Sequence, residues 1–273
     1  MKDIAIRAFS GLIYVLLLVF SLYNKHALII LFFIFGLICL AEFKKLIQLK
    51  SPISYILFTI LYFIFGYWQL VMNSSIGLDE ATQILQVITI FVLLFLIKDL
   101  FSEKTIPLFS SKRFILTTFY ISSAFVFLIL IANYYPEYNP NILLGCFILV
   151  WVNDTFAYLV GSRFGKQKLF PSISPKKTVE GFLGGLLFAC IASYFIAEYT
   201  NTLRFTYWLV IGIIVSVFGT LGDLIESKFK RQANVKDSGV IMPGHGGLLD
   251  RFDSIIFAAP FIYLFLRISH YVS

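Results

Sequence analysis

The chain has 273 residues, of which 59% are apolar and only 14% are charged, and its mean hydropathy is +0.87. A typical soluble domain carries roughly 25% charged residues, so the composition excludes a soluble globular domain. It equally excludes a disordered chain, which needs low hydrophobicity. The net charge of +7 does not imply nucleic-acid binding, because basic loops also orient membrane proteins and attract anionic lipids or phosphates. We therefore predict an all-α polytopic integral membrane protein that binds no nucleic acid.

Nine apolar segments follow one another along the chain, and each can cross a ~30 Å hydrocarbon layer as a helix, some with tilt or extra end residues. They are Ile4–Tyr23, Ala27–Ala41, Ile53–Met72, Thr82–Ile97, Phe114–Ala132, Ile142–Leu159, Phe182–Tyr199, Phe205–Ile225 and Ser254–Tyr271. The first segment follows Lys2 and Arg7 and lacks a small-residue cleavage site. We expect it to be retained as a first span and not removed as a signal peptide.

The basic residues are distributed unevenly between the two sets of connecting loops. The N-terminus and the loops after segments two, four, six and eight hold 19 of them, and the other side holds only Lys25, Arg204 and Arg267. Because positive loops stay in the cytoplasm, we predict a cytoplasmic N-terminus and an external C-terminus. The expected location is the cell (plasma or inner) membrane, with the functional face toward the cytoplasm.

Two long polar loops, Gly161–Gly181 and Glu226–Asp253, lie on this predicted cytoplasmic side, and the first half of the chain has nothing comparable. We therefore divide the chain into an N-terminal set of membrane helices, residues 1–140, and a C-terminal functional region, residues 141–273. No internal repeat is evident in the sequence, and this weakens the interpretation as an inverted-repeat transporter.

Four carboxylates lie in or beside the later apolar segments. Asp154 is inside the sixth segment, Asp223 lies at the cytoplasmic end of the eighth, and Asp250 and Asp253 precede the ninth with a spacing that puts them on one helix face. A central carboxylate costs ~2.5–3.5 kcal/mol on membrane-insertion scales. The structural alternatives are hydrogen bonding inside the bundle and helix capping. Beside a phosphate site, such oxygens also suit Mg²⁺, which usually takes one or two carboxylates and substrate oxygens.

The two polar loops combine many cations with a cluster of glycines. The cations are Arg163, Lys166, Lys168, Lys176, Lys177, Lys228, Lys230, Arg231, Lys236 and Arg251, and the glycines Gly244, Gly246 and Gly247 surround His245. The positive-inside rule alone accounts for basic loops, but glycines also let backbone N–H groups approach an anion. The stretch is no Walker loop. For His245, a phosphate contact and a plain turn residue both remain open.

Ser174 and Pro175 resemble a helix N-cap followed by the first helical position. We expect this pair to begin the seventh span, with Lys176 and Lys177 beside the helix N-terminus. Such a terminus is a ready site for a phosphate group, although a capped helix start explains the same residues.

The segment from Ser227 to Asp253 reads S-x-F-K-R-x₄-K-D-x-G-x₃-P-G-H-G-G-L-x-D-R-F-D. It resembles the signature of the phosphatidate cytidylyltransferases, or CDP-diacylglycerol synthases. The D-x-x-A-Y of Asp154–Tyr158 and the S-P-K-K-T-x-E-G of Ser174–Gly181 are also similar to the polar region upstream in that family. Met242 is the one departure we notice, and it is a conservative apolar change.

The resemblance implies a reaction of CTP with phosphatidate that gives CDP-diacylglycerol and pyrophosphate. It also implies a dependence on Mg²⁺ with K⁺ as a second ion, a helical fold and a homodimer. By motif position, Asp223 and Asp250 correspond to the carboxylates of the metal centre. As our hypothesis for the remaining roles, the catalytic set adds Asp253, Lys236 and His245. The expected substrate-binding set is Asp154, Lys176, Lys177, Ser227, Lys228, Lys230, Arg231, Gly244, Gly246, Gly247 and Arg251.

Three other functions remain open at this point. A CTP-dependent lipid or polyprenol kinase would transfer the γ-phosphate and release CDP. An alcohol phosphotransferase that consumes a CDP-lipid would carry a D-x₂-D-G-x₂-A-R string, which the sequence lacks. An anion transporter would line the membrane midplane with polar groups and would show flux in liposomes without CTP hydrolysis.

Overall fold

The computed structural model describes residues 2–68, 78–102, 104–135, 137–244 and 246–272, and most of them are helical. The first part contains α1 (Lys2–Leu22), α2 (Lys25–Leu46), α3 (Ile53–Leu61) with the π-helical η1 (Tyr62–Trp68), and α5 (Leu78–Phe101). A continuous run of α6 (Ser110–Leu116), π-helical η2 (Thr117–Ser122) and α7 (Ser123–Ala132) follows. The second part contains α8 (Asn141–Phe164), β1 (Lys168–Phe170), β2 (Ser174–Thr178), α9 (Val179–Thr200), α10 (Phe205–Gln232) and α11 (Leu249–Val272).

The helical membrane class predicted from the sequence is confirmed. Among the described residues, seven helical segments are long and apolar enough to cross a membrane, and Phe9–Leu22 and Ile53–Tyr67 are shorter apolar helices. Each predicted apolar segment is helical over its described residues, except that Tyr23 of the first forms a turn; the end of the third, residues 69–72, lies outside the described residues. A count of nine crossings and the cytoplasmic side of the N-terminus stay predictions.

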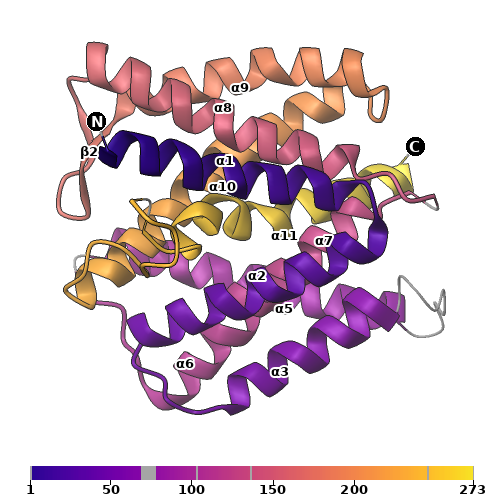
Figure 1. Ribbon diagram of the computed structural model, residues 1–273, viewed down its shortest axis with the longest axis horizontal. Helices are drawn as coiled ribbons and strands as arrows, with labels where there is room; N and C mark the ends of the chain where they lie inside the picture. The colour runs from indigo at the N-terminus through magenta and orange to yellow at the C-terminus, as the bar shows by residue number, and fades with distance from the viewer. Residues whose placement is uncertain (1, 69–77, 103, 136, 245, 273) are drawn as a thin grey trace.

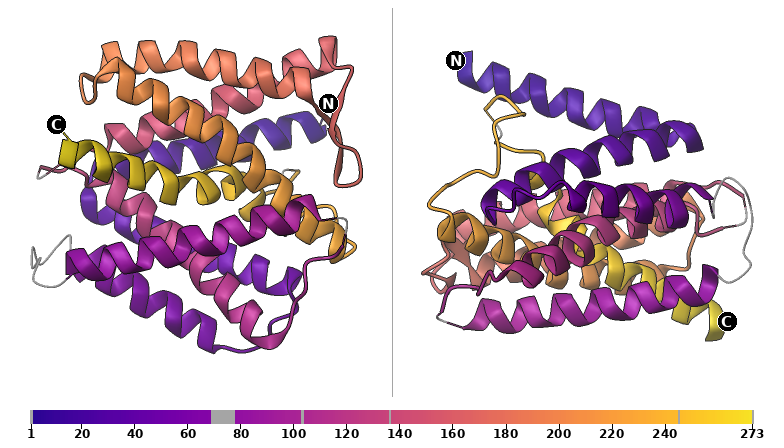
Figure 2. Two further views of the ribbon diagram at one scale, coloured as in Figure 1. Left: turned by 180° about the vertical axis from the view of Figure 1, so that it is seen from behind. Right: turned by 90° about the horizontal axis from the view of Figure 1, so that it is seen from below.

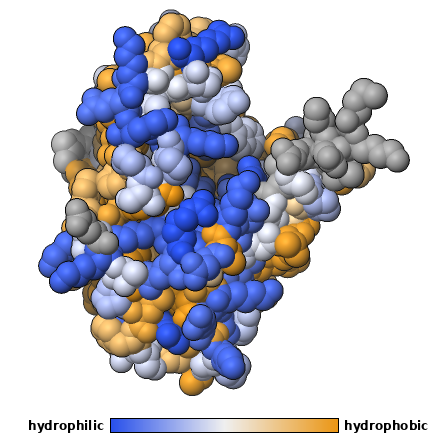
Figure 3. All heavy atoms as spheres, turned by 90° about the vertical axis from the view of Figure 1, so that its left-hand side faces the viewer, coloured by the Kyte–Doolittle hydropathy of each residue, from blue (hydrophilic) through white to orange (hydrophobic). Residues whose placement is uncertain are grey.

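The long helices run between two opposite ends of the molecule (Figure 1). The N-terminus, the β1–β2 hairpin and the first turns of α11 lie at one end, and the C-terminus lies at the other (Figures 1 and 2). We call the first the polar end, because hydrophilic residues cover much of its surface (Figure 3). Loops that the sequence assigns to one membrane side thus meet at one end of the fold.

The centre of the bundle is formed by α7 and α11, with every residue of α7 buried. The buried ring of Phe252, at the start of α11, contacts aromatic rings from four other helices. These rings belong to Tyr14 of α1, Phe32 of α2, Phe125 of α7 and Phe147 of α8, with centroids 5.6–6.1 Å from that of Phe252. Three of these four contacts are edge-to-face, an arrangement that aromatic pairs prefer. The two parts of the chain therefore share one core beneath the polar end.

The two polar loops are shorter in the structure than the sequence predicts. Helix α8 continues to Phe164 and α10 to Gln232, so only residues 165–178 and 233–248 lie between the long helices. Hydropathy marks only the apolar part of a helix, and polar side chains continue α10 for two further turns. The ion pair of Glu226 with Lys230, spaced i to i+4, and the basic residues in the last turn stabilise this extension.

The expected N-cap at Ser174 is wrong. Ser174 begins strand β2, which pairs antiparallel with β1, and the cap of α9 is Thr178, whose hydroxyl accepts the N–H of Gly181 at 3.1 Å. The Glu180 carboxylate accepts the N–H groups of Lys166 and Gln167 at 3.0 and 3.1 Å. These hydrogen bonds satisfy backbone N–H groups at the base of the hairpin. The chain therefore passes through the β1–β2 hairpin before α9 begins at Val179.

Candidate functional site

The polar end brings together charged side chains from β2, α8, α10 and α11. Lys177 of β2 lies with its ammonium 2.5 Å from Asp223 of α10, and the Ser227 hydroxyl donates to the same carboxylate at 3.3 Å. The charges of Asp154 and Asp253 also act on this pair. Partial burial opposes the charge on Lys177, but the attraction of Asp223 raises the pKa of its ammonium above the ordinary value. The two polar regions of the sequence thus meet through a directly paired cation and anion.

A second charged group lies on the same side of α10 and reaches the start of α11. The Lys230 ammonium contacts Glu226 at 2.5 Å and Asp250 at 2.6 Å, and Glu226 is fully buried. The other Asp250 oxygen accepts the N–H and hydroxyl of Ser238, each at 2.9 Å, and the N–H of Gly247 at 2.7 Å. Asp250 therefore ties the loop 233–248 to α10 and to the first turn of α11.

The loop 233–248 borders a cavity of about 510 Å³, within the size range of small-molecule sites. The residues that line it include Lys236, Gly244, Gly246 and Arg251. Both glycines have positive φ, 76° and 87°, a conformation that other residues rarely adopt. His245 lies outside the described residues, so its predicted contact with phosphate stays a prediction.

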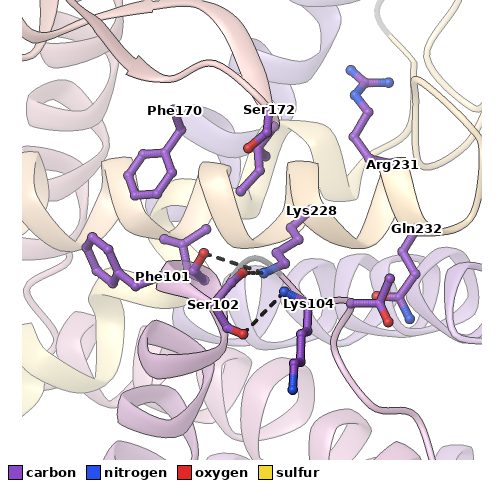
Figure 4. A pocket seen from close by; sticks show the side chains of 11 residues that line it. Phe101, Ser102, Lys104, Phe170, Ser172, Lys228, Arg231 and Gln232 are labelled. Carbon is purple, nitrogen blue, oxygen red and sulfur yellow. Dashed lines mark hydrogen bonds between the residues drawn. The ribbon is translucent and has the colours of Figure 1, made fainter.

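Lys228 and Arg231 line a cavity to which Asp223 and Asp250 do not contribute. The Lys228 ammonium contacts the carbonyls of Asp99 and Ser102, at 2.5 and 2.6 Å, at the end of α5. It lines a separate cavity of about 400 Å³ together with Phe170 and Arg231 (Figure 4). The predicted substrate-binding cations therefore fall into two groups. Lys230 belongs to the carboxylate cluster, whereas Lys228 stabilises the end of a neighbouring helix. Lys176 is exposed and alternates with Lys177 along β2.

This arrangement gives a testable prediction for Lys228. Replacing Lys228 by Met leaves the α5 carbonyls without their donor, so we expect the unfolding free energy to fall by about 1–3 kcal/mol. Lys228 lies on another side of α10 from Asp223, so any KM that depends on the charged cluster should stay within about twofold of its original value. Thermal unfolding in detergent and steady-state kinetics measure the two effects. A large rise in KM at unchanged stability would contradict this assignment.

Glu42 and Glu226 belong to this polar network, and the sequence analysis assigned neither of them a role. Glu42 of α2 accepts the N–H groups of Leu248 and Leu249 at 3.1 and 2.8 Å. The pairing of Glu226 with Lys230 has a signal in the sequence, the i to i+4 spacing. The Glu42 contact joins residues 206 and 207 positions apart and leaves no local pattern.

Asp223 and Asp250 are each paired with a lysine in this arrangement, so a magnesium site shared by the two carboxylates stays a prediction. An ammonium group already contacts one Asp223 oxygen, and both Asp250 oxygens accept hydrogen bonds from the protein. Within the described part of the chain, no group of three or more Asp, Glu, His or Cys side chains is arranged to hold a metal ion. Because Mg²⁺ demands near-octahedral oxygen coordination, the two carboxylates would have to release their lysine partners to hold one ion together.

Comparison with known proteins agrees with the motif. A model of the cytidylyltransferase family matches residues 5–269. The chain is 36% identical over 277 residues to a phosphatidate cytidylyltransferase of Bacillus subtilis (strain 168), covering 98% of this chain and 99% of that protein. Phosphatidate cytidylyltransferases of Staphylococcus aureus (strain COL) and Staphylococcus saprophyticus are 49% and 51% identical over 126 residues, 45% of this chain and 48% of theirs. The chain therefore belongs to the cytidylyltransferase family of polytopic membrane proteins.

Proposed function

We propose that this chain transfers the cytidylyl group of CTP to phosphatidate and releases pyrophosphate. The observation that carries the proposal is the charged cluster at the polar end, formed by signature residues in a chain that matches a phosphatidate cytidylyltransferase along almost its whole length. Both reactants are anions, so a site for them needs several cations. It also needs a position at the membrane surface, where a water-soluble nucleotide and a lipid can meet.

The proposed reaction needs no strong general base. The phosphomonoester of phosphatidate has a second pKa near ~6 and is largely a dianion at neutral pH. One of its oxygens attacks the α-phosphorus of CTP and forms a new P–O bond. The bond from the α-phosphorus to the bridging oxygen breaks, and pyrophosphate leaves with that electron pair. Catalysis then depends on holding the two reactants in line and on stabilising the charge of the leaving group.

Named residues supply these functions in the proposal. Lys177 leaves Asp223 for a substrate phosphate, while Lys236, Arg251 and the backbone around Gly244–Gly247 bind the triphosphate. Lys230 and Asp250 hold the loop in place. Asp154 and Asp253 act as neighbouring charges, Ser227 donates a hydrogen bond to Asp223, and His245 contacts a phosphate. Lys176 and Arg231 are exposed cations that attract the anionic reactants to the polar end.

The ions, location and assembly complete the proposal. We propose that Mg²⁺ enters as the counter-ion of the CTP triphosphate, with K⁺ as the monovalent ion, because Lys177 and Lys230 pair with Asp223 and Asp250 before the nucleotide binds. The enzyme is expected in the plasma or inner membrane as a homodimer, with the polar end in the cytoplasm.

The test is a transfer assay with purified protein in detergent micelles. CTP labelled in the cytosine base is incubated with Mg²⁺ and phosphatidate, and the lipid is extracted into chloroform. We expect cytosine label in the lipid phase with phosphatidate, and none when diacylglycerol, which lacks the phosphate, replaces it. Absence of labelled lipid, or equal labelling with diacylglycerol, would contradict the proposal.

A further inference from the structure

Glu42 is a buried carboxylate in the part of the chain that carries none of the signature motifs. It lies near the end of α2 and its side chain is 2% exposed. Burying a carboxylate is costly unless hydrogen bonds or opposite charge compensate it. The compensation here comes from residues 196–207 positions later in the chain.

The Glu42 carboxylate caps the N-terminus of α11 from another helix. Its Oε1 accepts the N–H of Leu248 at 3.1 Å and its Oε2 accepts that of Leu249 at 2.8 Å. The first N–H groups of a helix have no partner within the helix, and the helix dipole favours a negative charge at that end. Glu42 thus fixes the place at which α11 begins, directly before Asp250.

The same carboxylate is linked to Asp250 through one hydroxyl group. The oxygen of Ser238 lies 3.2 Å from Glu42 Oε2 and 2.9 Å from Asp250 Oδ2. Asp250 in turn binds the Lys230 ammonium. Ser238 and the first turn of α11 therefore connect Glu42 to the charged cluster.

Two glycines of the signature leave the space that this contact requires. A Cβ added at Gly247 would lie 2.6 Å from Glu42 Oε2, and one at Gly239 would overlap Glu42 Oε1. These glycines thus serve the close approach of a carboxylate as well as any contact with a phosphate. The loop also reaches α1, where the Ser10 hydroxyl donates to the carbonyl of Pro243 at 3.1 Å (Figure 2).

We propose that Glu42 is a positioning residue for cytidylyl transfer, which holds the loop 233–248 and the start of α11 in their working arrangement. This inference rests on the proposed function and assigns a role in it to the first part of the chain. Glu42 acts through Ser238, Asp250 and the α11 N-terminus, and it touches no substrate.

The central experiment compares Glu42→Gln with Glu42→Asp. The amide of Gln places an N–H donor against a backbone N–H, so kcat/KM for CTP per folded enzyme should fall on the order of 100-fold. Asp keeps the negative charge and should recover activity to within about tenfold of wild type. A purely structural role predicts fewer folded molecules with kcat/KM within about twofold of wild type for both variants, and this result would overturn the inference.

Lys44→Met is the matched control on the same helix. Lys44 is also buried, but its ammonium contacts the carbonyl of Ser51 and the ring of Tyr55, at 2.6 and 3.7 Å, and not the loop. We expect lower thermal stability with kcat/KM for CTP within about twofold of wild type. A loss as large as that of Glu42→Gln would show that any damage to α2 reduces activity, and would overturn the inference.

Ser238→Ala tests the link between the two carboxylates, and as a single variant it does not depend on the folding of Glu42→Gln. It removes the link between the two carboxylates and leaves the Glu42 bonds to the backbone. We expect about a tenfold loss of kcat/KM, and in the double variant no further loss beyond that of Glu42→Gln. Unchanged activity, or full additivity, would contradict the linkage. An inactive wild-type preparation would instead contradict the proposed function, so the two failures are distinguishable.

Discussion

Replacing Asp223 by Asn should lower the turnover number on the order of 100- to 1,000-fold. The neutral amide no longer attracts Lys177 of β2, so the hairpin loses its electrostatic contact with α10. In the proposed reaction the same lysine must alternate between Asp223 and a substrate phosphate. Loss of one preorganised charged group at a reacting centre has effects of this size. Steady-state assays with phosphatidate and labelled CTP measure the change.

Asp99→Asn is the matched control for Asp223. Asp99 also pairs with a lysine, Lys112, at 2.6 Å, and its side chain is 23% exposed against 30% for Asp223. It lies near the end of α5, where its carboxylate pairs with Lys112 and its charge also acts on the ammonium of Lys228. We expect turnover within about twofold of wild type, because an ion pair of this exposure contributes about 0–1 kcal/mol. Equal losses in the two variants would contradict a special role for Asp223.

Replacing Asp250 by Asn should also abolish most activity, but for a different reason. The carboxylate accepts bonds from Lys230, Ser238 and Gly247, so its loss frees the loop and leaves the buried Lys230 with Glu226 alone. Breaking a buried pair typically costs about 3–5 kcal/mol of stability. We expect a lower melting temperature and a loss of kcat on the order of 100-fold.

The magnesium requirement separates this role from metal binding. If Asp250 organises the loop, the Mg²⁺ concentration for half-maximal activity at fixed CTP should stay within about threefold of wild type. If Asp250 holds the ion directly, that concentration should rise by about tenfold or more. Asp250→Glu, which keeps the charge, supplies the measurement if the Asn variant does not fold. A tenfold rise in either variant would restore the metal assignment made from the motif.

Much of the fold could be predicted from composition and hydropathy, because long apolar runs leave few options other than membrane helices. Helix ends could not be predicted in this way. The apolar run of α10 ends at Ile225, whereas the helix continues to Gln232 because Glu226 and Lys230 pair along it. At the other polar region, Pro175 belongs to a strand, and the capping residue is Thr178, four positions later than predicted.

The candidate site could be predicted where its residues share a motif. Lys177 and Asp223, from two separate polar regions, do meet in the structure. The sequence could not separate Lys228 from Lys230, because that distinction depends on the continuation of α10, which turns the two side chains toward different neighbours. The role of Glu42 could not be predicted, because its partners are distant in sequence and the residues before it form the end of an apolar segment.

The most direct test of cytidylyl transfer follows the α- and the γ-phosphate of CTP separately. Parallel reactions contain phosphatidate and CTP labelled with ³²P in either the α- or the γ-phosphate, and the chloroform and water phases are counted. We predict α-label in the lipid and γ-label only in water-soluble pyrophosphate. Transfer of the γ-label to the lipid with release of CDP would identify a lipid kinase and would contradict cytidylyl transfer at the polar end.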